Sequence, residues 1–267
     1  MKIAVCIKQV PAGAKSVMDP EKGLLARIET DTRLNPYDAF AIEAALQIAE
    51  KTGGTLTAFT MGPPSAGQAL REALAMGVQA GVLLTDRAFA GADVAATSHT
   101  LGCAIKKAGG FDLIVCGQQT TDGDTAQVPF ALGACLGVCA LGWVTEISEV
   151  SEKEIFLTQE LSGGSQTVRA ALPACIAVGK GFLTPRLPSL AGRLAAKKKP
   201  LTMWGLADMA DQNPEHYGLH ASPTRVRRIY AAKAEQKASP IREPSSAVAQ
   251  RLRSAAKQAR EEGRHDE

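Results

Sequence analysis

Residues 111–136 read FDLIVCGQQTTDGDTAQVPFALGACL, and this stretch decides the fold. Its first six residues, 111–116, predict a strand. Residues 126–136 are apolar enough to form a buried helix, and the polar residues between the two elements form a loop. The stretch is therefore a strand, a loop and a helix, which is the repeating unit of a parallel α/β fold.

The same alternation extends towards the amino terminus. We expect strands at 2–7, 55–61 and 81–84 and helices at 38–50, 65–76 and 97–107. This order predicts a three-layer α/β sandwich whose sheet is mostly parallel, with helices on both faces. The composition fits, because 45% of the residues are hydrophobic but only 4% are aromatic. Small aliphatic side chains allow helices to pack closely on a sheet.

The pattern changes after residue 141. Short strand-like runs at 144–150, 154–159, 166–172 and 175–178 predict antiparallel hairpins that extend the first sheet. The turn Ser162-Gly163-Gly164-Ser165 faintly resembles a phosphate loop, but its place between two strands favours a hairpin turn. From residue 184 the chain is rich in proline and basic residues, and residues 247–262 have a helical pattern. We expect a nucleotide-binding domain at 1–183 and an extended and helical arm at 184–267.

The loop after the 111–116 strand carries the strongest chemical signal. Gly117 frees the backbone at the strand end, and Gly123 permits a positive φ in the turn. Asp124 or Thr125 is a suitable N-cap for the following helix, whose free N–H groups suit a phosphate. The alternative is an ordinary capped turn, since neither a Gly-x-Gly-x-x-Gly motif nor a P-loop is present.

Three further segments follow strands or begin a helix. They are Cys6 and Lys8, the run Asn35-Pro36-Tyr37-Asp38, and Met61. Each alone is explained by strand ends or helix initiation. Ligands of parallel sheets bind beyond the carboxyl ends of the strands, so these segments would meet the loop on one rim. Their convergence predicts a nucleotide site.

Several classes of function have little support. A net charge of +3 does not indicate a nucleic-acid partner, and no run reaches the roughly 18 apolar residues of a membrane span. The six cysteines form no Cys-x-x-Cys pair, so we expect reduced thiols, no metal site and a cytoplasmic protein. No His, Cys and Asp arrangement indicates nucleophilic catalysis, and we expect no catalytic residue.

Together these segments resemble the β subunit of electron transfer flavoproteins over nearly the whole chain. The colinear matches are Val5-Cys6-Ile7-Lys8-Gln9-Val10-Pro11, Asn35-Pro36-Tyr37-Asp38, Ala73-Leu74-Ala75-Met76-Gly77, the loop 117–128, Leu172-Pro173-Ala174, the Lys197 to Lys199 run and Ser222-Pro223-Thr224. The resemblance implies a heterodimer with an α subunit that carries a redox-active FAD. It also implies a second nucleotide on this chain, either AMP or, in bifurcating members, an FAD that accepts a hydride from NADH.

Two features of the resemblance favour FAD over AMP. Gly123 stands between Asp122 and Asp124 where AMP-type members carry a further acidic residue, and less charge and bulk there suits a longer dinucleotide. The loop 86–91 is also similar to that of bifurcating members. The cofactor-binding residues implied are Cys6, Lys8, Asn35, Pro36, Tyr37, Asp38, Met61, Gly117, Gln118, Gln119, Thr120, Thr121, Asp122, Gly123, Asp124, Thr125, Ala126, Gln127 and Val128.

The resemblance also implies a partner flavin dehydrogenase. Phe182 or Leu183 would anchor it, although the loop 180–186 lacks the family's acidic residue. Electrons from NADH would pass to a low-potential acceptor and to that acyl-CoA or hydroxyacid dehydrogenase. Two other classes of function remain open: a stand-alone nucleotide-sensing module, which would not need the arm, and a nucleotide hydrolase, which lacks a clear base or nucleophile.

Overall fold

A computed structural model describes residues 1–12, 16–18, 25–27, 31–181, 183–225 and 244–262. The chain forms two compact units, Met1–Arg228 and Ile229–Glu267. The strands are β1 (Lys2–Cys6), β2 (Gln9–Pro11), β3 (Ser16–Met18), β4 (Leu25–Arg27), β5 (Thr32–Leu34), β6 (Thr55–Met61), β7 (Ala80–Leu84), β8 (Leu113–Gly117), β9 (Cys139–Val150), β10 (Glu154–Leu161), β11 (Gly164–Ala171), β12 (Ala174–Val178) and β13 (Thr202–Trp204). The α-helices are α1 (Pro36–Thr52), α2 (Gly67–Met76), α3 (Val94–Lys107), α4 (Val128–Leu136), α5 (Leu190–Lys198) and α6 (Ser245–Glu262), and short 3-10 turns lie at Pro64–Ala66, Arg87–Phe89, Leu206–Asp208 and Pro214–His216.

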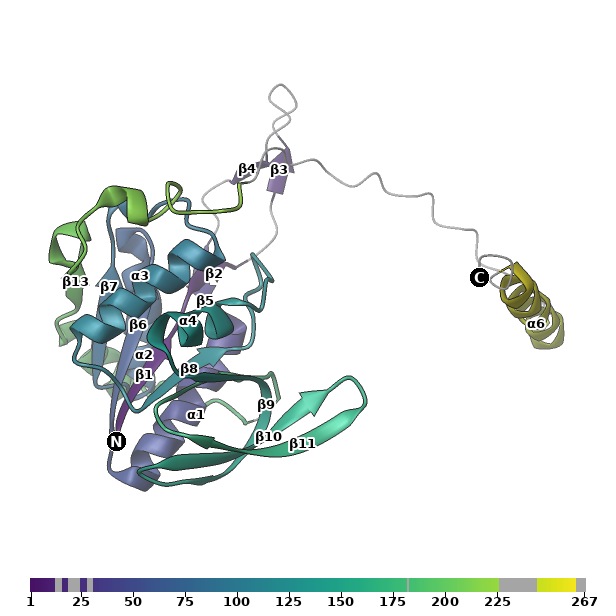
Figure 1. The fold of residues 1–267 in the computed structure, drawn as a ribbon, viewed down its shortest axis with the longest axis horizontal. Coiled ribbons are helices and arrows are strands. Elements are labelled where there is room, and N and C mark those ends of the chain that lie inside the picture. Colours follow the sequence, from purple (N-terminus) through teal and green to yellow (C-terminus); the bar gives the residue numbers. More distant parts are fainter. Residues whose placement is uncertain (13–15, 19–24, 28–30, 182, 226–243, 263–267) are drawn as a thin grey trace. The chain divides into compact units, whose positions relative to one another are not determined.

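A nine-stranded sheet in the order β11-β10-β9-β12-β8-β1-β6-β7-β13 organises the first unit (Figure 1). Neighbouring strands from β13 to β9 are parallel, whereas β10 pairs antiparallel with both β9 and β11. The predicted mostly parallel sheet with antiparallel strands is therefore confirmed. The expected hairpin at 162–165 joins β10 to β11.

The strand at 174–178 is not part of a hairpin, which corrects one expectation. β12 lies inside the sheet, parallel to both β8 and β9, and all five of its residues are buried. The reason is that both its faces are apolar, as suits a strand covered by helices on both sides.

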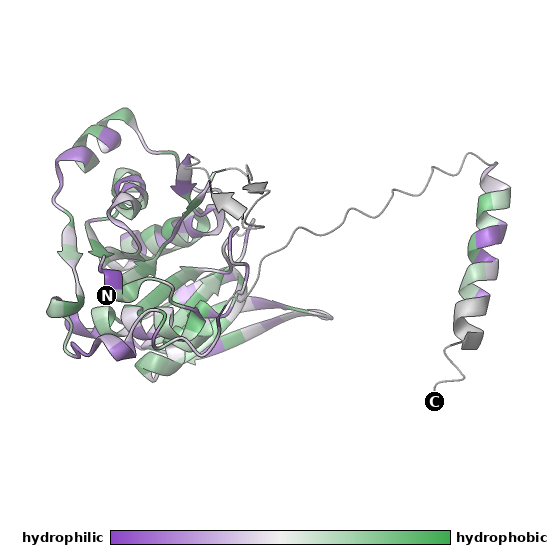
Figure 2. Cartoon of the chain, turned by 90° about the horizontal axis from the view of Figure 1, so that it is seen from above, coloured by the Kyte–Doolittle hydropathy of each residue, from purple (hydrophilic) through white to green (hydrophobic). Residues whose placement is uncertain are grey.

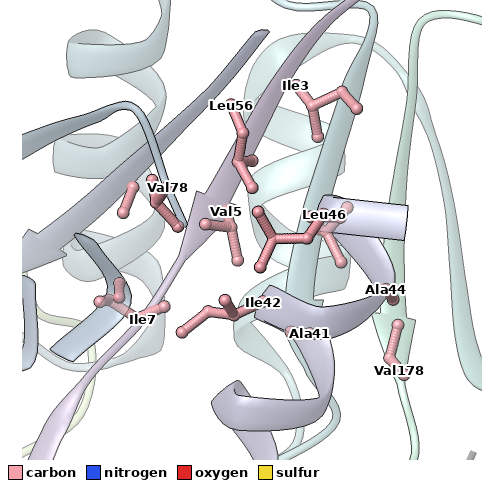
Figure 3. Close-up of a cluster of buried hydrophobic side chains, with 14 of the residues drawn as sticks. Ile3, Val5, Ile7, Ala41, Ile42, Ala44, Leu46, Leu56, Val78 and Val178 are labelled. Carbon is pink, nitrogen blue, oxygen red and sulfur yellow. The ribbon is translucent and has the colours of Figure 1, made fainter. Parts of the chain in front are cut away.

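Two hydrophobic cores lie on opposite faces of the sheet. Along β1, Ile3 and Val5 point to a core shared with α1 and α2, while Ala4 and Cys6 point to a second core with α3 and α4. Figure 3 shows residues of the first core, where Ile42 and Leu46 of α1 meet β1. In Figure 2 much of the ribbon of the first unit is green, the colour of hydrophobic residues, with purple, hydrophilic segments between.

The strand order reverses at β1. The chain runs from β1 through β6 and β7 on one side, then crosses back to form β8 on the other side of β1. The carboxyl ends of β1 and β8 therefore flank the topological switch point, which is where ligands bind in open α/β sheets. This position lies directly before the loop 117–127.

Much of the predicted arm packs on the first unit. β13 pairs parallel with β7, and Ala196 of α5 is buried in the core beneath α2. The contact is close, since a Cβ on Gly192 would lie 2.6 Å from the carbonyl oxygen of Ala75. The boundary expected at 183/184 thus falls inside the first unit.

The second unit contains α6, with Leu252 exposed and Val248 half-buried. No helix in the described part of the chain is long and apolar enough to cross a membrane. The described residues also hold no cluster of His, Cys, Asp or Glu that could bind a metal ion.

Candidate functional site

The loop 117–127 has a different backbone from the one expected. Positive φ angles fall on Asp124 (50°) and Ala126 (53°) and not on Gly123. α4 begins at Val128, with Gln127 as an N-cap that makes no side-chain capping bond, so neither Asp124 nor Thr125 caps it. The reason is that Pro129, in the first turn, suits a helix start at Val128. Residues 121–125 are left as an exposed polar loop.

Gly117 is required by close packing of the loop against α1. A Cβ at this position would lie 2.3 Å from Oδ1 of Asp38 and 2.9 Å from the carbonyl carbon of Tyr37. Separations below 3 Å are closer than carbon atoms tolerate, so only glycine fits here. The amino terminus of α1 and the end of β8 are thereby held in direct contact at the switch point.

Asn35 and Asp38 link β1, α1 and the loop through buried hydrogen bonds. Nδ2 of Asn35 donates to Oδ1 of Asp38 (2.8 Å) and to the carbonyl oxygen of Gln119 (2.9 Å). The Lys8 N–H donates to Oδ2 of Asp38 (2.6 Å), and the Thr121 N–H donates to Oδ1 of Asn35 (3.3 Å). Asn35 makes no side-chain capping bond to α1, because its side chain is hydrogen-bonded to Asp38 and to the loop 117–127 instead.

The electrostatics of the site depend on Asp38. Burial raises the pKa of this carboxyl group to about 7, although hydrogen bonds from Asn35 and Lys8 oppose the shift. Across the loop, Nζ of Lys8 donates to Oδ1 of Asp122 at 2.8 Å. Burial alone would raise the pKa of Asp122, but the Lys8 ammonium group holds it below its ordinary value.

The remaining predicted residues lie around the same rim. Nε2 of Gln119 donates to the Tyr37 hydroxyl group (3.1 Å), and the Asp124 N–H donates to the Thr120 carbonyl oxygen (3.1 Å). Cys6 lies beside Cys116 on the adjacent strand, and the hydrogen bond between the thiols together with burial raises the pKa of Cys6 well above its usual range. Met61 is half-buried at the end of β6.

The structure adds partners that the sequence did not indicate. Oε1 of Gln118 accepts the N–H of Trp143 at 2.5 Å. On the far side of α1, Arg186 donates to Glu43 through Nε (2.8 Å) and to Glu50 through Nη1 (2.6 Å). These contacts join residues 25 and more than 100 positions apart, so no local pattern could have revealed them.

Asp86 and Asp93 accept hydrogen bonds from backbone N–H groups on both sides of the loop 86–93. Asp86 accepts the N–H groups of Ala88 and Leu206. Asp93 caps α3 by accepting the Ala96 N–H, and it also accepts from Thr224. Both carboxylates thus tie residues 206 and 224 to the loop 86–93.

Phe182 and Leu183 are the two residues predicted to dock the partner dehydrogenase. Phe182 lies outside the described residues. Leu183 is half-buried and packs against the core on the α1 face. Its role in docking stays a prediction.

An open parallel sheet with a polar, glycine-containing loop at its switch point places the molecule in the class of ligand-binding α/β proteins. Residues 23–209 match the family described as electron transfer flavoprotein domain. "Caffeyl-CoA reductase-Etf complex subunit CarD" of Acetobacterium woodii is 40% identical over 236 residues, covering 88% of this chain and 89% of that protein. "Electron transfer flavoprotein subunit beta" of Clostridium acetobutylicum is 40% identical, covering 85% and 87%, and "Protein FixA" of Azorhizobium caulinodans is 39% identical, covering 88% and 85%.

The chain therefore belongs to the electron transfer flavoprotein family, as a β subunit. The resemblance noted in the sequence is confirmed at this level.

Proposed function

We propose that this chain binds FAD at the switch point and accepts electrons from NADH within a heterodimer with an electron transfer flavoprotein α subunit. The observation that carries the proposal is the close packing and hydrogen bonding of Gly117, Asn35 and Asp38. It fixes the loop 117–127 across the ends of β1 and β8 while leaving residues 121–125 exposed. A rigid base below an exposed polar loop suits a nucleotide phosphate chain.

The donors around the loop fit an anionic ligand. Thr121 and Thr125 are exposed residues with hydroxyl groups, and the Lys8 side chain is 44% exposed and bonded to Asp122. Burial keeps Asp38 partly protonated at neutral pH, which limits the negative charge near the phosphates. Bound FAD would supply hydride acceptance and one-electron release, whereas the chain positions the flavin and shapes its environment.

FAD is favoured over AMP because the loop leaves room for the longer dinucleotide. Gly123 presents no side chain between Asp122 and Asp124, and a Cβ there would have only the Thr120 hydroxyl oxygen within 4 Å, so the loop has open space beside it. The relative from Acetobacterium is named as a subunit of a complex with a caffeyl-CoA reductase. Such a complex suggests that this chain also delivers electrons to a dehydrogenase or reductase acting on a CoA thioester or hydroxyacid. A low-potential acceptor would take the other electron of each pair.

The partner dehydrogenase would dock near the segment that follows β12. Arg186 anchors this segment to the buried Glu43 of α1. Just beyond the anchor, Leu187 is 91% exposed, Leu190 76% and Leu194 54%. α5 thus buries Ala196 and exposes its leucines, which is the reverse of an ordinary surface helix and typical of an interaction surface.

The test is the nucleotide content of the co-purified heterodimer, released by denaturation and separated by chromatography. Two FAD per heterodimer support the proposal. One FAD and one AMP would overturn it in favour of a single-flavin carrier, in which this chain is a scaffold and docking surface. Purification of this chain with a nucleotide but without any α subunit would instead favour the stand-alone sensing module.

A further inference from the structure

The docking segment, residues 183–188, lies between β12 and α5 and has no helix or strand of its own. A backbone without helix or sheet hydrogen bonds is ordinarily one of the less stable parts of a fold. Arg186 is the only residue of this segment that makes a hydrogen bond to another described residue. The segment nevertheless carries Leu187, which is 91% exposed. Its conformation therefore depends on Arg186 and on the packing of Leu183 against the core.

Arg186 attaches the docking segment to α1 through five hydrogen bonds to two carboxylates. Its backbone N–H and its Nε donate to Oε2 of Glu43 at 3.0 and 2.8 Å, and Nη2 donates to Oε1 of Glu43 at 3.1 Å. Nη1 and Nη2 also donate to Oε1 and Oε2 of Glu50 at 2.6 and 3.2 Å. A planar guanidinium group bonded to both oxygens of a carboxylate has a fixed orientation. These contacts fix the residue that directly precedes Leu187.

Glu43 makes this attachment strong, because its side chain is only 5% exposed, compared with 57% for that of Glu50. Burial alone would raise the pKa of Glu43, but the hydrogen bonds from Arg186 hold it below its ordinary value, so the group is charged at neutral pH. Without Arg186, this buried carboxylate would be bonded among the described residues only to Gln47. Removing one partner of a buried ion pair is strongly unfavourable. The docking segment therefore cannot leave α1 without a large free-energy cost.

The helix that receives Arg186 also carries residues of the candidate nucleotide site. Asn35 and Asp38, at the start of α1, bond to the loop 117–127 and to Lys8. Glu43 lies five positions beyond Asp38 on the same helix, which corresponds to about 7.5 Å along the helix axis. The docking segment and the nucleotide loop are thus attached to one helix, and their separation is fixed by it.

We propose that Arg186 is a positioning residue for electron transfer to the partner dehydrogenase, because its bonds to Glu43 and Glu50 hold the docking segment in the conformation that the partner binds. The inference rests on the proposed docking surface and adds the residues that preorganise it. A partner that binds a preformed surface does not have to order the segment. Where the segment is out of place in a fraction of the molecules, the apparent affinity falls by that fraction.

The consequence is a specific kinetic change. Loss of the Arg186 contacts raises the dehydrogenase concentration that gives half-maximal transfer, because fewer molecules present the docking segment correctly. The maximal transfer rate stays the same, because the complex that finally forms is unchanged. A residue that acted only on the stability of the fold would alter neither quantity in the folded protein.

The test measures electron transfer from the reduced heterodimer to an acyl-CoA dehydrogenase and to a hydroxyacid dehydrogenase, each over a range of concentrations, together with amide hydrogen exchange in the docking segment. Arg186→Met combined with Glu43→Gln removes both charges, so that no unpaired charge is buried. Arg186→Lys keeps a charge but loses the planar group that bonds two carboxylates. Glu50→Gln removes only the exposed carboxylate. Arg169→Met is the matched control, because it removes another arginine–glutamate pair, the exposed one with Glu154.

We expect the half-saturating dehydrogenase concentration to rise about tenfold in the double variant and about threefold in Arg186→Lys and Glu50→Gln. The maximal rate should stay within about twofold of the wild type, and amide exchange in the docking segment should be faster. Arg169→Met should match the wild type in all three measurements.

An unchanged half-saturating concentration in the double variant would overturn the inference and leave the docking surface standing, and so would a lower maximal rate at an unchanged half-saturating concentration. Absence of transfer from the wild-type heterodimer to either dehydrogenase would overturn the docking surface and the inference together. If the double variant does not fold, Glu50→Gln decides, because that side chain is largely exposed and its loss leaves Glu43 paired with Arg186.

Discussion

At the residue scale, Gly117 is the position where the site tolerates least change. A methyl group there would meet Oδ1 of Asp38 at 2.3 Å and the backbone of Tyr37 at 2.9 Å. We expect Gly117→Ala to lower the free energy of unfolding by about 1–3 kcal/mol, because backbone and a buried carboxylate must move apart. Nucleotide retention should fall with it, since the same contacts hold the loop. Chemical denaturation and nucleotide release measure the two effects.

A second glycine provides the control for this substitution. Gly163 lies at the turn between β10 and β11, where a methyl group would have no atom within 4 Å, and its φ is not positive. Gly163→Ala should change the free energy of unfolding by no more than about 0.5 kcal/mol. Equal losses for the two variants would show that close packing at Gly117 is not the cause.

The carboxyl group of Asp38 gives the stability of the fold a pH dependence. Its pKa is raised by burial from 3.8 to about 7, so the folded state holds a proton that the unfolded chain has released. This contribution is fully present below about pH 3.8 and is lost as pH rises to 7 and beyond. At about 1.4 kcal/mol per pKa unit, the loss amounts to a few kcal/mol.

The comparison with Asp38→Asn isolates this effect. Asparagine cannot accept from both Asn35 and Lys8, so the variant should be less stable at every pH. Its free energy of unfolding, however, should decline less than that of the wild type between about pH 4 and about pH 8. Denaturant titrations across this range measure the difference, and parallel curves for the two proteins would exclude Asp38 as the titrating group.

Residue types that signal their role locally were predictable, and residues that act through distant partners were not. Gly117, Asn35 and Asp38 stand beside a strand end or a helix start, and the structure brings them together. Gln118 was among the predicted cofactor-binding residues, but its hydrogen bond to Trp143 joins two separate segments and lies where the register between β9 and β12 shifts. The positive φ angles lie on Asp124 and Ala126, where reasoning from the sequence expected a glycine.

At the scale of elements, periodicity identified the buried strands and helices well. β6 spans Thr55–Met61 as expected, and α1 extends the predicted helix at both ends. Pairing was harder to predict, because β12 has the length of a hairpin strand yet lies between β8 and β9. α5 was missed because its outward face carries leucines, so its pattern is the inverse of the one that marks a buried helix face.

This inverted face leads to a prediction for Leu190. An aspartate there would place a charge in the centre of the proposed contact with the partner dehydrogenase. We expect Leu190→Asp to slow electron transfer to the dehydrogenase at least about tenfold, with nucleotide content and thermal stability unchanged, because the side chain is 76% exposed. Stopped-flow reduction of the dehydrogenase by the heterodimer measures the rate.

The control for Leu190 is an exposed apolar residue outside α5 in the same unit. Met203 of β13 is 55% exposed, and Met203→Asp should leave the transfer rate as it is in the wild type. A rate unaffected by Leu190→Asp would remove α5 from the docking surface and return attention to Leu183.

At the scale of the whole molecule, the residues beyond 183 divide between the two compact units. Residues 184–225 complete the first unit through α5, β13 and the contacts of Asp93 with Thr224. Composition could not show that residues 184–225 belong to the first unit. Their proline and lysine residues suggest an extended segment, whereas their packing on the first unit depends on a few small or apolar residues such as Gly192 and Ala196. The second unit begins only at Ile229.

This division predicts what removal of the second unit would do. The first unit contains the nine-stranded sheet, both hydrophobic cores and the candidate site, so deletion of residues 229–267 should leave its unfolding midpoint unchanged. α6 exposes Leu252, which suits a contact with the α subunit. We therefore expect the deletion to weaken association of the two subunits at least about tenfold, as measured by sedimentation or titration calorimetry. A truncated chain that binds the α subunit with wild-type affinity would rule out this role for α6, whereas a lowered unfolding midpoint would show that the first unit depends on it.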